Sequence, residues 1–324
     1  MNKTQAPIVE VTVPETFQRR LPDIKTIVSH ASCPDGTAAA IVLRSVYYPS
    51  NVRLIQYGPQ RDLLDPEPGM LFVDMTPHEA KVQAFVDAGA YVIDHHRTQR
   101  GIVEAFGERG WYSETACGTE MAVAHMGSFR VHSETDRALI RRFALLAGVR
   151  DLWKVEHEHW ELALIQGEAL RFYPESWWFG DPSPDGGEGF FPHPPYLLEQ
   201  EAQVGIVTRS KVRQEVKKLV DDRAFALHER CGVRVATLAA PSNSVSEAAN
   251  AILEADLADV VVALFLVQEG AETRLVRSYR SKKGGVDVGE ICKLAGGGGH
   301  RSAAGYSEEL NVHVELNLYA GLRD

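Results

Sequence analysis

The feature that most constrains the fold is a regular alternation of short apolar runs with longer amphipathic segments in the first half of the chain. A short apolar run bounded by polar residues is typical of a buried strand. The segment at 37–46 and the one opened by Thr76 and Pro77 are typical of helices. Strands separated by helices predict a parallel sheet with helices on its faces. The predicted strands lie at 24–29, 52–57, 70–74 and 91–93.

The second half contains a second alternating set, separated from the first by an irregular segment. Helical patterns continue at 118–124 and 134–147, and Trp, Phe, Gly and Pro then dominate residues 171–195, where no helix is expected to run through. That segment is either a linker or a functional flap. We predict an α/β fold with a larger domain at 1–165, a linker or insert at 166–204 and a smaller α/β domain at 205–324. In the latter, we expect helices at 208–231, 245–255 and 288–295, and strands at 233–239, 260–267 and 273–278.

Composition excludes several classes of protein. Lys and Arg number 34 against 44 Asp and Glu in 324 residues, so the formal net charge is −10 and a basic nucleic-acid coat protein is excluded. Apolar runs stay well below the ~18–20 residues of a membrane helix, and residues 1–22 lack the apolar core of a secretory signal. We therefore expect a cytoplasmic protein with no membrane partner. Its cysteines form no CxxC pair and are expected to be reduced thiols: Cys33, Cys117, Cys231 and Cys292.

Acidic and histidine residues follow the predicted strands. Because the carboxyl ends of parallel strands meet at one edge of a sheet, we expect these side chains to converge there. Carboxylates and imidazoles gathered in one place need a cation between them, and a mixed Asp and His ligand set favours Mn²⁺. The candidates are His30, Cys33 and Asp35 after the first strand, Asp74 after the third, Asp94, His95 and His96 after the fourth, and Asp151 after the helix at 134–147.

Four consecutive glycines at 296–299 precede His300 near the end of the second domain. Patterned apolar sequence flanks them, so we interpret them as a turn whose amides can line an anion site rather than as a flexible linker. Four cations lie upstream within residues 277–283, on or just after a strand. These cations either are solvated at the edge of the sheet or bind a phosphate group.

Together these motifs resemble the DHH phosphoesterase superfamily, in the branch with the DHH-associated C-terminal domain. That branch includes RecJ-type exonucleases, nano-RNA/phosphoadenosine phosphate phosphatases and cyclic-dinucleotide phosphodiesterases. The motifs occur in the family's order and span most of the chain. They are 33–36 (Cys-Pro-Asp-Gly), Asp74, 94–96 (Asp-His-His), Asp151, 296–300 (Gly-Gly-Gly-Gly-His) and 303–305 (Ala-Ala-Gly).

The resemblance implies two Mn²⁺ ions at the sheet edge and an active site in the cleft between the two domains. Asp74 would bridge the metals, with Asp35, His95 and Asp151 completing one of them. Asp94 would orient its neighbour and His96 would face the scissile phosphate. The far end of the substrate would be held by Arg277, Ser278, Arg280, Gly297, Gly298, Gly299 and His300.

The first motif departs from the family pattern, which has His or Asp and then two Asp residues at nearly alternate positions. Here the equivalent of Asp-x-Asp is Cys33-Pro34-Asp35, or else Asp35-Gly36-Thr37. We favour the first because Asp35 runs directly into the helix. The second metal would then have His30 and Cys33 as ligands, with weaker or different metal selectivity.

The resemblance and the acidic net charge favour a metal-dependent phosphohydrolase that acts on short oligonucleotides or small nucleotides. The leading expectation is a nano-RNase, a 3′–5′ or 5′–3′ exoribonuclease, with added phosphatase activity on phosphoadenosine phosphate. Alternatives are a cyclic or linear dinucleotide phosphodiesterase, a single-strand DNA exonuclease, and a nucleotide-binding sensor with a degenerate metal site. The sequence leaves the assembly state open, with a homodimer as one alternative.

Overall fold

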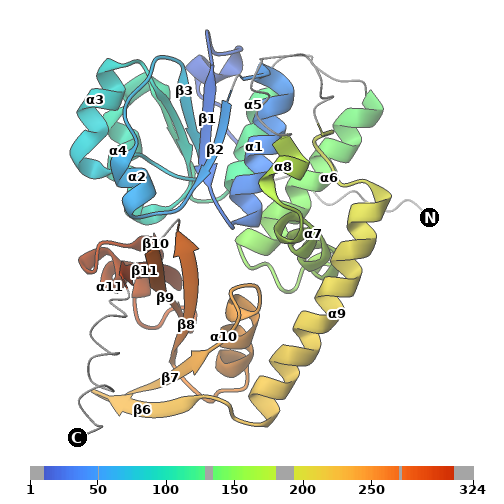
Figure 1. Ribbon diagram of the computed structural model, residues 1–324, viewed down its shortest axis with the longest axis vertical. Coiled ribbons are helices and arrows are strands. Elements are labelled where there is room, and N and C mark those ends of the chain that lie inside the picture. The colour runs from blue at the N-terminus through green and yellow to red at the C-terminus, as the bar shows by residue number, and fades with distance from the viewer. Residues whose placement is uncertain (1–10, 50, 128–133, 180–192, 270–271, 310–324) are drawn as a thin grey trace, which may run out of the picture. The chain divides into compact units, whose positions relative to one another are not determined.

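The computed structural model describes residues 11–49, 51–127, 134–179, 193–269 and 272–309. The chain divides into two compact units, Met1–Lys211 and Val212–Asp324, each with its own sheet and core. The division falls inside helix α9 (Glu199–Asp221), which continues from one unit into the other (Figure 1). Two units of mixed helices and strands confirm the predicted fold class.

A parallel sheet forms the centre of the first unit, as the alternating pattern predicts. The strand order is β2-β1-β3-β4-β5, and every neighbouring pair is parallel. The carboxyl ends of all its strands therefore lie at one edge. The strands are β1 (Thr26–His30), β2 (Asn51–Ile55), β3 (Met70–Val73), β4 (Tyr91–Asp94) and β5 (Gly110–Tyr112).

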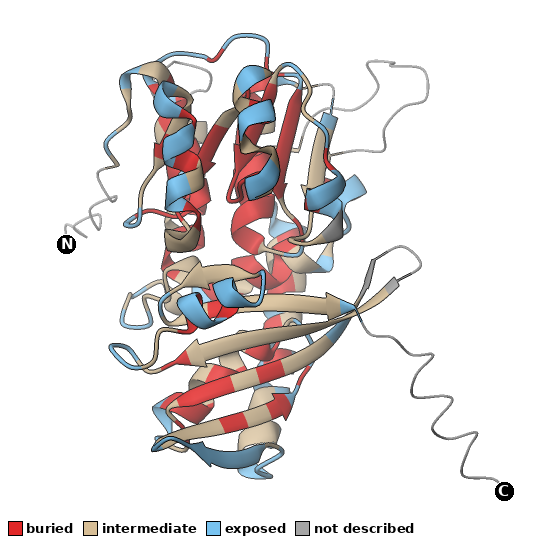
Figure 2. Cartoon of the chain, turned by 90° about the vertical axis from the view of Figure 1, so that its left-hand side faces the viewer, coloured by how far each residue is buried: buried red, intermediate tan, exposed pale blue. Residues whose placement is uncertain are grey.

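Both faces of this sheet are covered by helices, because successive apolar residues point to opposite faces. Ile27 belongs to the core on the side of α1 and α5, whereas Val28 belongs to the core on the side of α3 and α4. Figure 1 shows these helices on the two sides of the sheet, and Figure 2 shows the strands buried between them. The helices are α1 (Pro34–Tyr47), α2 (Pro59–Leu63), α3 (Val82–Asp87), α4 (Arg100–Ala105), α5 (Gly118–Gly127), α6 (Glu134–Asp151), α7 (Trp160–Phe172) and α8 (Glu175–Phe179).

The helix expected to open at Thr76 begins later. The Thr76 hydroxyl donates to Gln99 Oε1 at 2.8 Å instead of capping a helix. His78 takes the capping position, because its Nδ1 accepts from the Ala80 amide at 3.2 Å. Short 3-10 helices occupy Glu15–Gln18, Glu79–Lys81, Arg97–Gln99 and Gly107–Arg109.

The second unit is a six-stranded sheet in the order β10-β11-β9-β8-β7-β6. The pair β7–β8 is parallel and the other pairs are antiparallel. Helix α10 packs on one face with Leu238 and Val261, and α11 packs on the other with Val260 and Ala304. The elements are β6 (Ala226–Arg230), β7 (Val233–Ala239), α10 (Val245–Glu254), β8 (Val260–Glu269), β9 (Glu272–Ser281), α11 (Val288–Leu294), β10 (Gly298–His300) and β11 (Ala303–Glu309).

The prediction of a helix over 208–231 is wrong at the carboxyl end of that range. Helix α9 ends at Asp221, and the chain reverses at Arg223, whose φ is +48°. The Ala224 amide then donates back to the Leu219 carbonyl at 2.9 Å. This closed end releases residues 226–230 to form β6, which pairs with β7. No helix in the described parts of the chain is long and apolar enough to cross a bilayer.

The Trp-rich segment at 171–195 contains more helix than the sequence suggests. Helix α7 continues to Phe172 and α8 covers Glu175–Phe179, whereas residues 180–192 lie outside the described part. Trp178 is 1% exposed in the core of the first unit. The Trp177 indole donates to Glu201 Oε1 on α9 at 2.7 Å. At these positions the aromatic residues hold the segment against the first unit.

Candidate metal centre

The structure brings the acidic and histidine residues of the first unit together at the carboxyl edge of its sheet. His30 and Asp94 are the last residues of β1 and β4, and Asp74 follows β3 directly. Asp35 lies in the first turn of α1. Helix α6 runs through to Asp151 rather than ending at 147, so this carboxylate is carried by the last turn of a helix.

The Asp35 carboxylate is held rigidly by the beginning of α5. Its Oδ2 accepts from the Gly118 amide at 2.7 Å. Its Oδ1 accepts from the Thr119 amide at 2.9 Å and from the Thr119 hydroxyl at 2.6 Å. Burial by itself raises the pKa of Asp35, but His95 and the hydrogen bonds from Cys117 and Thr119 outweigh it, so the pKa is lowered. Asp35 therefore stays an anion in the interior.

Asp74 lies between two groups of donor atoms. It is fully buried, with a left-handed φ of +57°, and its amide donates to the Ile93 carbonyl at 3.0 Å. Its Oδ1 is 3.0 Å from His95 Nε2, and its Oδ2 is 3.9 Å from His30 Nδ1. Oδ2 accepts no hydrogen bond from any described residue. Burial, followed by repulsion from Asp35, raises the pKa of Asp74 to about 7.

The first donor group consists of Asp35, His95 and Asp151, with Asp74 Oδ1 beside it. His95 Nε2 is 3.6 Å from Asp35 Oδ2 and 3.5 Å from Asp151 Oδ2. Around an octahedral ion with bonds of about 2.1 Å, neighbouring ligand atoms lie about 3 Å apart. Spacings of 3.0–3.6 Å therefore fit a divalent cation at the centre of this group.

The second donor group consists of His30, Cys33 and Asp74, whose ligand atoms lie within 4.8 Å of one another. Within the described chain, neither His30 Nδ1 nor Asp74 Oδ2 has a hydrogen-bond partner, although both atoms are buried. Burial, followed by repulsion from His96, lowers the pKa of His30 to about 4. Its ring is therefore neutral at pH 7 and can offer a nitrogen lone pair to a metal.

Asp94 orients His96 and raises its pKa. Its Oδ1 accepts from His96 Nδ1 at 2.8 Å and from the His95 amide at 2.8 Å. Burial opposes the charge on His96, but Asp94 outweighs it, so the pKa of His96 is raised. This pairing fixes the ring of His96 and favours its protonated form.

Tyr57 lies beside the candidate ligands, although no sequence motif contains it. Its ring centroid is 5.0 Å from that of His30 and 6.4 Å from that of His96. The Tyr57 hydroxyl is buried without a hydrogen-bond partner in the described chain, and the Arg61 guanidinium lies 4.8 Å from its ring centroid. The available signal was its position at the end of a predicted strand, next to the other strand ends.

Loading this centre with Mn²⁺ is expected to release protons. Burial opposes a charge on His95, but Asp151 and Asp74 outweigh it and raise its pKa well above the ordinary value. Metal ligands must be deprotonated, so the ion displaces the proton of His95 and the fraction of Asp74 protonated below its pKa of about 7. The apparent affinity should therefore fall as the pH drops through 7, by up to about tenfold per pH unit for each displaced proton.

Isothermal titration calorimetry with Mn²⁺, in buffers that differ in ionisation enthalpy, measures this release. A binding enthalpy that is the same in every buffer at pH 7 would contradict the proposed protonation of the metal-free site.

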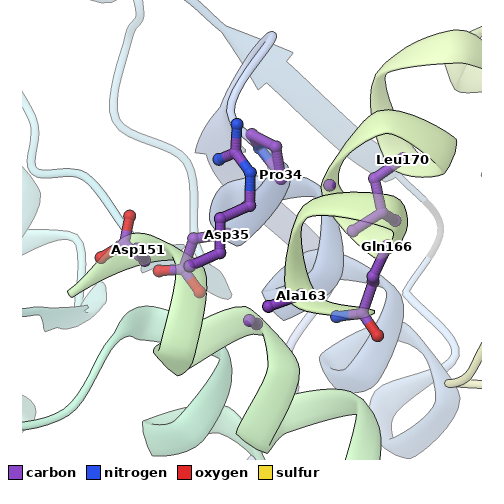
Figure 3. A pocket seen from close by; sticks show the side chains of 9 residues that line it. Pro34, Asp35, Asp151, Ala163, Gln166 and Leu170 are labelled. Atoms are coloured by element: carbon purple, nitrogen blue, oxygen red, sulfur yellow. The ribbon is translucent and has the colours of Figure 1, made fainter. Parts of the chain in front are cut away.

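A small cavity of about 10 Å³ lies beside the first donor group. In Figure 3, Asp35 and Asp151 lie on one side of it, and Gln166 and Leu170 of α7 line the other. A space of this size holds at most one water molecule. The cavity therefore has room for a water beside Asp35 and Asp151, not for a substrate.

The cationic residues predicted to bind substrate lie on β9 of the second unit and already have partners there. The Arg277 Nε donates to Glu308 Oε1 on β11 at 2.9 Å. The Arg280 guanidinium donates to the hydroxyls of Ser278 at 3.0 Å and Ser246 at 2.8 Å. A substrate phosphate would have to compete with Glu308 for Arg277. Binding by these residues stays a prediction.

The glycine run is not an open turn. The amides of Gly296 and Gly297 donate to the carbonyls of Lys293 and Cys292, at 3.1 and 2.9 Å, and close the end of α11. Gly298–His300 then form β10, paired with β11. A Cβ at Gly297 would lie 2.1 Å from the Gly305 carbonyl oxygen, so close backbone packing requires glycine there. Since the Gly297 amide is used, an anion would have to be bound by other groups.

Comparisons with known proteins found matches among solved structures. A pGpG-specific phosphodiesterase, PggH, from Vibrio cholerae is 11% identical, with a TM-score of 0.34 over 91% of this chain and 97% of its own. RecJ from Thermus thermophilus in complex with Mn²⁺ is 17% identical, with a TM-score of 0.46 over 93% of this chain and 53% of its own. An exopolyphosphatase-related protein from Bacteroides fragilis is 12% identical, with a TM-score of 0.45 over 94% and 92%. Neither a family model nor a curated protein matches the sequence.

The motif residues of the first unit, widely separated in sequence, come together in the structure. His30, Asp35, Asp74 and the run 94–96 meet at one sheet edge, with Asp151 beside them. Asp74 lies between the two donor groups, and its bridging of two metals stays a prediction. The centre is therefore a candidate site for two divalent cations.

Proposed function

We propose that this chain is a divalent-metal-dependent phosphohydrolase of the DHH type that cleaves phosphodiester bonds. The observation that carries the proposal is the position of Asp74, whose Oδ1 lies 3.0 Å from His95 Nε2 of the first donor group and whose Oδ2 lies 3.9 Å from His30 Nδ1 of the second. Paired metal positions are typical of enzymes that catalyse in-line displacement at phosphorus. When bound, the ions would supply Lewis-acid activation of water and of the phosphoryl group.

The chain's own residues would position the reactants and handle one proton. Asp35 is held by α5 and cannot swing away from the metal position, because three donors from two residues hold it. His96, oriented through Nδ1 by Asp94, would donate a proton from Nε2 to the leaving oxygen. The neutral hydroxyl of Tyr57 is a further donor for a phosphate oxygen, since burial and then Asp94 raise its pKa well above the ordinary value.

We further propose that the substrates are short oligoribonucleotides, degraded from one end by an Mn²⁺-dependent exoribonuclease. Tracking along a long polymer normally uses many phosphate contacts, and a chain with a formal charge of −10 is poorly suited to that. Phosphatase activity on phosphoadenosine phosphate belongs to the same proposal. Hydrolysis of cyclic or linear dinucleotides and exonuclease action on single-stranded DNA are the alternatives within the same chemistry.

A nucleotide-binding sensor is the second candidate. The observation that favours it is the departure in the first motif, where Cys33, or in the other register Thr37, stands at a position that the family fills with Asp. Against it, the first donor group is complete without either residue, because Asp35, His95 and Asp151 converge. Metal content and turnover together separate the two candidates.

The test is product analysis with Mn²⁺-loaded protein on 5′-labelled RNA and DNA oligomers of increasing length, starting from dinucleotides. Phosphoadenosine phosphate and a cyclic dinucleotide are assayed alongside. We expect the shortest RNAs to disappear fastest with release of mononucleotides, and the position of the label in the products gives the polarity of attack.

Turnover that increases with oligomer length would contradict the proposed preference for short substrates. Bound Mn²⁺ without turnover of any of these substrates would favour the sensor.

A further inference from the structure

The two donor groups at the sheet edge differ in their chemistry. The first offers only carboxylate oxygens and an imidazole nitrogen, from Asp35, His95 and Asp151. The second contains a sulfur atom, because Cys33 lies with His30 and Asp74. We propose that Cys33 binds the second metal as a thiolate, so that this position selects a softer ion such as Zn²⁺ or Co²⁺ while the first accepts Mn²⁺ or Mg²⁺. This inference rests on the metal centre of the proposed function.

The geometry of the second group supports a ligand role for Cys33. Cys33 is the residue that precedes α1, which places its side chain at the carboxyl edge of the sheet with His30 and Asp74. Its sulfur lies within 4.8 Å of a histidine nitrogen and a carboxylate oxygen that are themselves candidate ligands.

Two further atoms of the group point to a missing ligand, independently of the cysteine. Asp74 is fully buried and its Oδ2 lacks a hydrogen-bond partner, as far as the structure describes the chain, and the same holds for the buried His30 Nδ1. A buried carboxylate oxygen without a partner is costly, and a cation shared with a neighbouring nitrogen and sulfur removes that cost.

The other cysteines have different surroundings. Cys117 is fully buried at the beginning of α5, where its sulfur accepts from the Glu120 amide at 3.5 Å. Cys231 is exposed and Cys292 is buried, both in the second unit. Cys33 is thus distinguished by its neighbours His30 and Asp74 of the second group, whereas Cys117 interacts with Asp35 of the first group and the exposed Cys231 provides the control away from the site.

The expected selectivity follows from ligand type. Thiolate and imidazole ligands favour Zn²⁺ and Co²⁺, whereas Mg²⁺ prefers oxygen donors. On binding, the Cys33 thiol loses its proton to the buffer and its sulfur forms a bond to the metal. An Asp at this position would offer oxygen alone and remove the preference.

The test is a titration of the metal-free full chain with Co²⁺, followed by absorption spectroscopy and by measurement of bound metal. A thiolate bound to Co²⁺ gives a sulfur-to-metal charge-transfer band in the near ultraviolet. We expect this band as the second ion binds, and we expect Cys117→Ser and Cys231→Ser to retain it. Cys33→Ser should lose the band and bind the second ion at least about 10-fold more weakly. Cys33→Asp should lose the band, bind two ions and shift the second position toward Mn²⁺.

Each other outcome overturns the inference in a recognisable way. Two bound Co²⁺ ions without the band, in an active enzyme, would remove Cys33 from the ligand set and leave the proposed function intact. A band that is retained in Cys33→Ser but lost in Cys117→Ser would show that Cys117, and not Cys33, is the thiolate ligand. Failure to bind any Co²⁺, Zn²⁺ or Mn²⁺ would overturn the metal centre and the proposed function together. If Cys33→Ser unfolds, circular dichroism reveals it, and Cys33→Asp then carries the comparison.

Discussion

Replacing Asp74 with Asn is expected to lower the rate of phosphodiester hydrolysis by at least about 10³-fold. The reason is that the metals would no longer stabilise the transition state, a loss of several kcal/mol. Asp74 belongs to the second donor group and its Oδ1 lies beside His95 of the first, so a single substitution is expected to weaken both metal positions. Asn is preferred to Ala in this test because the backbone has a φ of +57°, which Asn tolerates better than most residues.

The same substitution should not destabilise the metal-free protein. An acid whose pKa rises on folding, here from 3.8 to about 7, binds a proton more tightly in the folded state. Its contribution therefore destabilises the fold progressively as the pH rises from about 4 to about 7, because the unfolded chain loses that proton first. We expect the melting temperature of metal-free Asp74→Asn to equal that of the wild type near pH 4 and to exceed it near pH 8.

Asp23→Asn is the matched control, since Asp23 is exposed and also has a left-handed φ, of +50°. It should retain both turnover and metal content. Full activity in Asp74→Asn with both ions bound would refute the bridging role, and a lower melting temperature at pH 8 would refute the electrostatic argument.

Gly118→Ala is expected to lower activity and metal affinity by about 10- to 100-fold, the range typical for residues that orient metal ligands. A Cβ at Gly118 would lie 2.9 Å from the Asp74 Cβ and 3.0 Å from Asp35 Oδ2. Either Asp35 or Asp74 must then shift, and the Gly118 amide loses its 2.7 Å bond to Asp35. Overpacking of this kind also lowers the free energy of unfolding by about 1–3 kcal/mol.

Gly127→Ala, at the other end of α5, separates this effect from a general effect of alanine in the helix. A Cβ at Gly127 would meet no described atom within 4 Å. It should therefore leave metal affinity unchanged and alter stability by at most about 1 kcal/mol. Equal activity in the two variants would show that the beginning of α5 does not position Asp35. The readouts are Mn²⁺ affinity, kcat and thermal melting.

Several boundaries depended on interactions that no local pattern contains. Residues 226–230 form a strand because Arg223 takes a left-handed conformation and β7 provides a partner edge. The expected turn at 296–299 becomes part of a hairpin because β11 lies beside it. In both cases a partner distant in sequence decides the outcome, whereas propensity describes only the nearest neighbours.

In the candidate site, too, some residues could be predicted from the sequence and others only from the structure. The motif residues Asp35, Asp74 and Asp151 could be chosen because strand and helix ends have recognisable patterns. The groups that orient them could not: Thr119 is 84 residues from Asp35 and carries no motif of its own. Tyr57 ends a predicted strand, but only the structure shows its ring beside that of His30.

The sequence by itself determined the first four strands of the first unit and the chemical identity of the candidate metal donors, because hydrophobic periodicity and residue type are local properties. It did not show β5 or the helices α2, α4, α7 and α8. Only the tertiary structure decided that the two Asp74 oxygens face different donor groups and that Cys33 joins one of them. Those arrangements depend on which strand ends lie side by side in a parallel sheet, and that order follows from the packing of helices on both faces.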